Sequence, residues 1–257
     1  MKKNQFFSML AFAGSILLVT SCSKTGPAGP AGNSGPAGPS LTGNLKGHIF
    51  QYDQYGSPIL TGLAGIRDSL NPTNIAVTDT GGFYKFTGLT TGDYSFSVSK
   101  AGYGTVIAQE LQIVGGGDIY HDLRIAQIPN FAVTTPTATL NGVTGNIDIT
   151  ANVGATDTKT REVLIFVGSS PSTSSNPATY LNVYAKTIAA TKTSVINSLA
   201  PSDIHDLGIN TGGTLYVSVY AATVTYNSAS FYQDLATGKT VYTALGATPM
   251  TCSVIAP

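Results

Sequence analysis

The sequence predicts an all-β protein in which two tandem antiparallel β-sandwiches follow a disordered tether with polyproline II character. Short segments after residue 41 alternate between apolar and polar residues, which is the period of a strand with one buried face. Clusters of Gly, Asp, Ser and Pro separate these segments, and hydrophobic residues make up 42% of the chain, enough for packed cores. We expect four regions: 1–21, 22–40, 41–128 and 129–257.

Residues 1–21 read as an export signal. Lys2 and Lys3 precede an apolar run from Phe6 to Val19, and small residues follow it. This run is shorter than the roughly 20 residues that span a bilayer, which argues against an uncleaved anchor. Val19-Thr20-Ser21-Cys22 resembles a bacterial lipobox. The resemblance implies that Cys22 becomes the N-terminus and carries the lipid that attaches the protein to a membrane. An ordinary secretory signal is the alternative.

Residues 26–40 consist of Gly-X-Y triplets, the repeat that a collagen triple helix requires. The segment is very short for a triple helix, so we expect a semi-rigid polyproline II tether, with trimerisation through the triplets as the alternative. At ~3.1 Å per residue, the spacer after Cys22 reaches about 55 Å. The layout resembles lipoproteins of the Bacteroidota, which implies the outer membrane. In that group, export to the cell surface usually follows acidic residues just after the cysteine. Ser23-Lys24-Thr25 are not acidic, so the protein could lie on the periplasmic face or on the cell-surface face of the membrane.

The first domain is predicted at residues 41–128. Apolar residues and glycine alternate with Lys46 and His48 along 45–49, and aromatic or apolar residues alternate with serines along 94–98. Turn-forming clusters fall at residues 56–58, 79–82, 91–93 and 115–118. About seven short strands in ninety residues predict a sandwich.

This domain resembles carboxypeptidase regulatory-like domains. The matching motifs include Gly47-His48-Ile49-Phe50, Thr78-Asp79-Thr80-Gly81-Gly82-Phe83-Tyr84-Lys85-Phe86 and Gly92-Asp93-Tyr94-Ser95-Phe96-Ser97-Val98. The resemblance implies a transthyretin-like sandwich of the carbohydrate-binding-like fold group, usually a non-catalytic accessory. Some related surface sandwiches cross-link a lysine to an Asn or Asp with help from a glutamate. Lys46, Asp122 and Glu110 are the only trio that suggests this here.

The second domain is predicted at residues 129–257, after Pro129. Strands are expected at residues 146–153, 162–168, 180–188, 214–224 and 239–244. Leu199-Ala200-Pro201 and the later tyrosine strand 213–221 resemble the second half of a fibronectin type III module. The resemblance implies a fibronectin-III-like or immunoglobulin-like sandwich, and such modules usually act as spacers or adhesive surfaces.

Composition and spacing argue against several kinds of chemistry. The formal net charge is zero, which disfavours nucleic acid as a partner. The three histidines, His48, His121 and His205, lack metal-ligand spacing, so we expect no metal and no cofactor. We expect no enzyme activity, and the alternative is a hydrolase in which His205 joins Asp203 or Asp206 and a serine. Once Cys22 is lipidated, Cys252 is a lone thiol, expected to be buried and inert.

Tyrosines supply the candidate ligand-binding residues, because Tyr180, Tyr184, Tyr216 and Tyr220 alternate outward from apolar neighbours. Exposed rings could stack on sugars or on a protein partner. The alternative is that they face another layer of the fold. The sequence therefore predicts a non-catalytic, lipid-anchored envelope protein for adhesion or scaffolding. The alternative function is a carbohydrate-binding lipoprotein that presents glycan to an uptake system.

Overall fold

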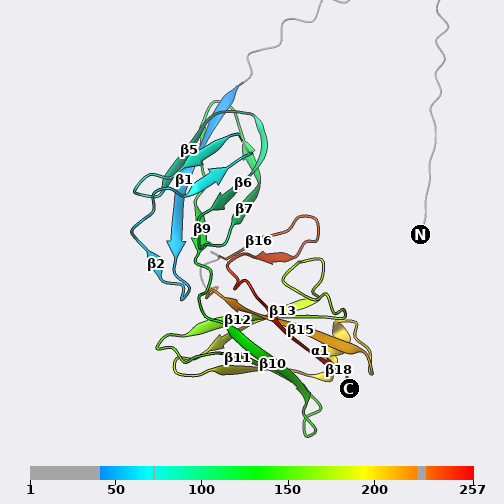
Figure 1. Cartoon of the computed structure of the whole chain (residues 1–257). Coiled ribbons are helices and arrows are strands. Elements are labelled where there is room, and N and C mark those ends of the chain that lie inside the picture. Colours follow the sequence, from blue (N-terminus) through cyan, green and yellow to red (C-terminus); the bar gives the residue numbers. More distant parts are fainter. Residues whose placement is uncertain (1–40, 72, 225–229) are drawn as a thin grey trace, which may run out of the picture. The chain divides into compact units, whose positions relative to one another are not determined.

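The computed structural model describes residues 41–71, 73–224 and 230–257. The predicted export signal, Cys22 and the Gly-X-Y spacer lie outside the described residues. In the described part nearly all regular structure is β-strand, which confirms the all-β prediction (Figure 1). No helix there is long and apolar enough to cross a bilayer.

The first sandwich contains two sheets. The β1 sheet is made of β1 (Thr42–Tyr52), β2 (Pro58–Ile59), β5 (Phe83–Thr90), β8 (Asp118–Tyr120) and β9 (Leu123–Ala126). The β6 sheet is made of β3 (Arg67–Ser69), β4 (Ile75–Val77), β6 (Gly92–Ser99) and β7 (Val106–Ile113). β5 pairs antiparallel with one edge of β1, while β8 and β9 pair with the other edge in parallel. The other strand pairs of this sandwich are antiparallel, as the sequence predicts, and β8 and β9 add a parallel pairing to them.

Every second residue of the strands in the first sandwich points inward, and these residues form its core. Leu45 and Ile49 on β1 are buried, and Tyr84, Phe86 and Phe96 pack with ring centroids 5.6–6.3 Å apart. Each such buried side chain stabilises the fold by about 1.5–3 kcal/mol. The intervening β1 residues are at least partly exposed, so β1 carries one apolar and one polar face.

The second sandwich also contains two sheets. One is made of β10 (Val133–Leu140), β11 (Ile147–Val153) and β14 (Ser194–Leu199). The other, the β12 sheet, is made of β12 (Arg161–Gly168), β13 (Asn182–Ile188), β15 (Thr214–Ala222) and β18 (Met250–Ile255). Apolar residues such as Ile149, Ile165 and Val217 fill the space between the sheets. The short helix α1 (Pro201–Asp206) lies between β14 and β15.

A hairpin of β16 (Phe231–Gln233) and β17 (Thr240–Tyr242) follows β15 in the chain. Its Tyr242 packs on Phe166 of β12, with ring centroids 5.8 Å apart. β12 is therefore buried on both faces, one against the main core and the other against a smaller aromatic cluster.

Residues 41–257 belong to one compact unit, within which segments of the two sandwiches make direct contacts. The Tyr55 hydroxyl donates to Asp157 over 2.7 Å, and the Thr223 hydroxyl donates to the carbonyl of Gln127. Gly104 lies against residues 243–244, where an added Cβ would come within 2.5 Å of the Thr243 carbonyl carbon. The two-domain boundary at residues 128–129 stays a prediction.

Candidate ligand-binding face

Two of the four tyrosines predicted to bind a ligand are buried. Tyr180 is 4% exposed and Tyr220 is 8% exposed, and both pack edge-on against Phe166. The Tyr180 hydroxyl donates to the carbonyl of Thr240 over 2.7 Å. The expectation that these two rings face solvent is therefore wrong, because the β16–β17 hairpin covers the outer face of the β12 sheet.

The other two tyrosines lie in different surroundings. Tyr184 is half-buried against the main core of the second sandwich, and burial raises the pKa of its hydroxyl. Tyr216 lines a shallow hollow with Cys252. The four rings do not form one exposed patch, and the predicted stripe cannot act as a single binding surface.

The polar face of the β1 sheet is the better candidate. Its residues, all at least partly exposed, come from three adjacent segments: Thr42, Asn44, Lys46, His48 and Phe50 from β1; Phe83 and Lys85 from β5; Asp118 and Tyr120 from β8, with Asp122 just beyond. We call this set the β1 face. It combines aromatic rings with amide, amine and carboxylate groups, which can contact both the apolar and the polar parts of a ligand.

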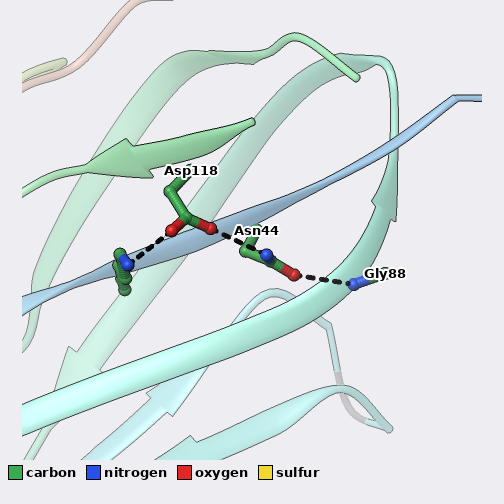
Figure 2. Close-up of polar contacts among 4 residues, drawn as sticks. Asn44, Gly88 and Asp118 are labelled. Atoms are coloured by element: carbon green, nitrogen blue, oxygen red, sulfur yellow. Dashed lines mark hydrogen bonds and ion pairs between the residues drawn. The ribbon is translucent and has the colours of Figure 1, made fainter. Parts of the chain in front are cut away.

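Three side chains at one end of the β1 face form a hydrogen-bonded cluster (Figure 2). Asn44 Nδ2 donates to one Asp118 oxygen over 2.7 Å, and Lys46 Nζ donates to the other over 2.5 Å. The backbone N–H of Gly88 donates to the Asn44 side-chain oxygen over 3.3 Å. These bonds hold the carboxylate in one orientation, and they raise the pKa of Lys46 and lower the pKa of Asp118.

The cluster keeps unused hydrogen-bonding capacity. Each carboxylate oxygen of Asp118 has a second lone pair, and the Lys46 amine has three N–H donors. The Asp118 side chain is 39% exposed, so a ligand can reach it. An ion pair at the surface adds little to stability, so the structural role of this pair is small.

Tyr120 provides an exposed ring beside this cluster. It is 68% exposed, and Lys46 Nζ lies 4.5 Å from the ring centroid. Tyr120 pairs with Lys46 across the parallel ladder, as Asp118 pairs with Asn44. Paired positions on one face lie about 5 Å apart, so ring, amine, amide and carboxylate form one compact group.

The other end of the β1 face centres on His48. Its ring lies 5.4 Å from the ring of Phe83 and 6.3 Å from that of Phe50. Asp122 accepts a hydrogen bond from the His48 backbone N–H over 2.8 Å, and the same oxygen lies 3.8 Å from His48 Nδ1. Aromatic surface and a carboxylate therefore lie together at both ends of the face.

A hollow of about 250 Å³ lies between β7, β9 and β16. Its polar and aromatic lining consists of Gln109, His121, Asp122, Arg124, Phe231 and Tyr232. Asp122 belongs both to this hollow and to the β1 face. Burial lowers the pKa of His121, so its imidazole is neutral at neutral pH.

The residues weighed for catalysis and cross-linking have other contacts. Asp203 accepts a hydrogen bond from the backbone N–H of Ala200 over 2.9 Å and caps α1, which carries His205. Lys46 pairs with Asp118 and not with Asp122, and Glu110 is exposed. No group of three His, Cys, Asp or Glu residues that could hold a metal ion occurs in the described part of the chain.

Cys252 is half-buried on β18 and forms no disulfide. Burial raises the pKa of its thiol to about 11. Since the thiolate is the reactive form, this supports the expectation of an inert thiol.

No protein-family profile and no curated protein sequence matches this chain. Among solved structures, a candidate carbohydrate-binding protein from Bacteroides uniformis aligns with 15% identity over 85% of this chain and 100% of its own, at a TM-score of 0.32. A DUF3823 family protein from Parabacteroides merdae aligns with 12% identity over 72% of this chain and 92% of its own, at a TM-score of 0.26. The major pilin SpaD of Corynebacterium diphtheriae aligns with 12% identity over 83% of this chain and 65% of its own, at a TM-score of 0.24. Similarity at this level says nothing about what the present chain binds.

Proposed function

We propose that the protein is a non-catalytic, lipid-anchored binding protein of the bacterial outer membrane and that its ligand is a glycan bound on the β1 face. The lipobox-like segment ending at Cys22 supports the anchor, and the Gly-X-Y spacer supports a role in holding the binding domains away from the membrane.

The observation that carries the glycan proposal is the exposed Tyr120 ring beside Asp118, Asn44 and Lys46. A sugar ring presents an apolar C–H face and a rim of hydroxyl groups. The tyrosine ring covers the first and excludes water from it. The carboxylate, amide and amine supply acceptors and donors for neighbouring hydroxyls, each of which both donates and accepts.

The alternative partner is an envelope or surface protein. A protein interface is expected to have a largely apolar and desolvated centre with few charges. The centre of the β1 face carries Lys46, Lys85 and Asp118 beside its aromatic rings, which fits a hydroxyl-rich ligand better.

Isothermal titration of the full chain in detergent with neutral and N-acetylated oligosaccharides tests the proposal. We expect Tyr120→Ala to weaken binding at least tenfold, Tyr120→Phe to retain most of it, and Asp118→Ala to weaken it severalfold. Ile196→Ala, at a 57% exposed position of β14, is the matched control and should bind normally. Failure of the unchanged protein to bind any sugar, or normal binding by Tyr120→Ala, would overturn the proposal.

A further inference from the structure

The β1 face continues into the hollow beside β9. Asp118, Tyr120, Asp122 and Arg124 occupy alternate positions along β8 and β9, and all four are exposed. At a rise of about 3.3 Å per residue, this row of side chains extends about 20 Å. Asp118 and Tyr120 lie together with Asn44 and Lys46, and this group is called the Tyr120 site. Asp122 and Arg124 line the hollow.

The hollow carries a polar group without a partner. The side-chain oxygen of Gln109 is buried and accepts no hydrogen bond from any residue that the structure describes. A buried acceptor left unpaired destabilises a protein, so a ligand gains a favourable contact when the Gln109 side chain turns its amide into the hollow that it lines. The neutral imidazole of His121 offers one donor and one acceptor nearby.

The shape and charge of the hollow restrict what it can hold. About 250 Å³ accommodates a single six-membered ring with its substituents. Asp122 and Arg124 carry opposite charges, so the lining favours a neutral ring over an anion. Phe231 and Tyr232 on β16 provide aromatic surface for the apolar face of such a ring.

We propose that the hollow is a second sugar subsite and that the protein binds an extended neutral glycan chain instead of a single terminal sugar. One unit stacks on Tyr120, the chain follows the row along β8 and β9, and a further unit enters the hollow between Gln109 and Tyr232. This inference rests on the proposed glycan function and adds the length of the ligand and its direction on the sheet.

Titration of the full chain with one oligosaccharide series, from monomer to hexamer, tests the second subsite. The series is chosen among β-linked glucose, mannose, xylose and N-acetylglucosamine oligomers by what the unchanged protein binds. We expect the affinity of the unchanged protein to rise at least tenfold from the shortest to the longest oligosaccharide. Tyr232→Ala and Gln109→Leu should abolish this gain and leave monomer binding unchanged, whereas Tyr120→Ala should weaken binding at every length.

Gln109→Leu removes the unpaired acceptor without leaving a void, so its fold should be retained even if Tyr232→Ala proves unstable. If both hollow variants keep the full gain with length, the second subsite is overturned while the Tyr120 site stands. If the unchanged protein shows no gain with length, the subsite is equally overturned. If Tyr120→Ala also binds every oligomer normally, the proposed function fails with it.

Discussion

The backbone of Gly47 lies directly against the carbonyl group of His121. A Cβ atom at residue 47 would come within 2.1 Å of the His121 oxygen and 2.7 Å of its carbonyl carbon. The same oxygen accepts a hydrogen bond from the buried Tyr84 hydroxyl over 2.6 Å, and the His121 N–H donates to the carbonyl of Lys46 over 2.9 Å. This close approach is where the chain passes from β8 to β9 beside β1, so it sets the positions of both Tyr120 and Asp122.

Gly47→Ala should therefore destabilise the first sandwich. Both clashing atoms are backbone, and inserting a methyl group into packed structure typically lowers the free energy of unfolding by about 1–3 kcal/mol. For a chain of this size each kcal/mol corresponds to about 2–4 °C in Tm. Thermal unfolding followed by circular dichroism measures the loss. Gly142→Ala, at an exposed glycine with no atom within 4 Å of the added Cβ, is the control, and an equal Tm for both variants would contradict the argument.

Asp68 should make stability fall as pH rises. Its side chain is fully buried on β3, neither oxygen has a hydrogen-bond partner in the described structure, and burial raises its pKa from 3.8 to about 7. Below pH 3.8 the folded and unfolded states are both protonated. Between pH 3.8 and 7 only the unfolded state releases the proton, so the free energy of unfolding decreases with pH. Above pH 7 the loss is complete, at about 4 kcal/mol for a shift of about three pKa units.

Chemical denaturation of the unchanged protein and of Asp68→Asn at pH 4 and pH 8 isolates this contribution from that of other carboxylates. From pH 4 to pH 8, the free energy of unfolding of Asp68→Asn should rise by about 4 kcal/mol relative to that of the unchanged protein. A difference between the two proteins that does not change with pH would show that Asp68 ionises normally in the fold.

Tyr180 should contribute to stability instead of ligand binding. Replacing the buried ring with Ala removes its packing on Phe166 and should lower the free energy of unfolding by about 3–5 kcal/mol. Tyr180→Phe keeps the ring but leaves the Thr240 carbonyl without its donor, with an expected loss of about 1 kcal/mol. Denaturant titration orders the variants, and a Tyr180→Ala protein as stable as the unchanged one would contradict the buried position.

Cys22→Ala should release the protein from the membrane. Lipid on Cys22 is the proposed attachment, and a chain lacking it has no acyl groups to bury in the bilayer. Metabolic labelling with an alkyne fatty acid and fractionation of cells test this. The label should disappear, and the protein should move from the membrane to the soluble fraction or be retained unprocessed. Cys252→Ala is the control and should label normally, whereas persistent labelling of Cys22→Ala would exclude this site.

Local pattern predicted much of the strand content. Alternation located the strands at 146–153 and 162–168 to within one residue of β11 and β12. It missed β10, β14, β16 and β18. Polar threonines and serines weaken the alternation in β10 and β14, β16 has only three residues, and nothing pointed to the six-residue helix α1. A helix as short as α1 is less than two turns long, so the 3.6-residue period of apolar residues cannot be recognised in its sequence.

The candidate site was harder to predict because its parts are far apart in sequence. Asn44 and Asp118 are separated by 74 residues and meet through the parallel pairing of β1 with β8. The outward position of Lys46 was visible in the alternation, but Asp118 read as part of a glycine-rich turn. No local signal connects the two, since a parallel ladder between distant strands leaves no turn motif in the sequence.

The sequence by itself determined the all-β class, the approximate strands and the sides to which residues such as Lys46 and Tyr220 point, because side-chain direction in a strand follows from a period of two. Only the tertiary structure decided which of those sides meets water. Tyr220 points outward from the main core yet is buried, since the hairpin that covers it comes from residues 231–242. Tyr120 stays exposed because no later segment that the structure describes packs over its ring. Burial is a property of the assembled layers, and it depends on contacts between segments that local patterns do not relate.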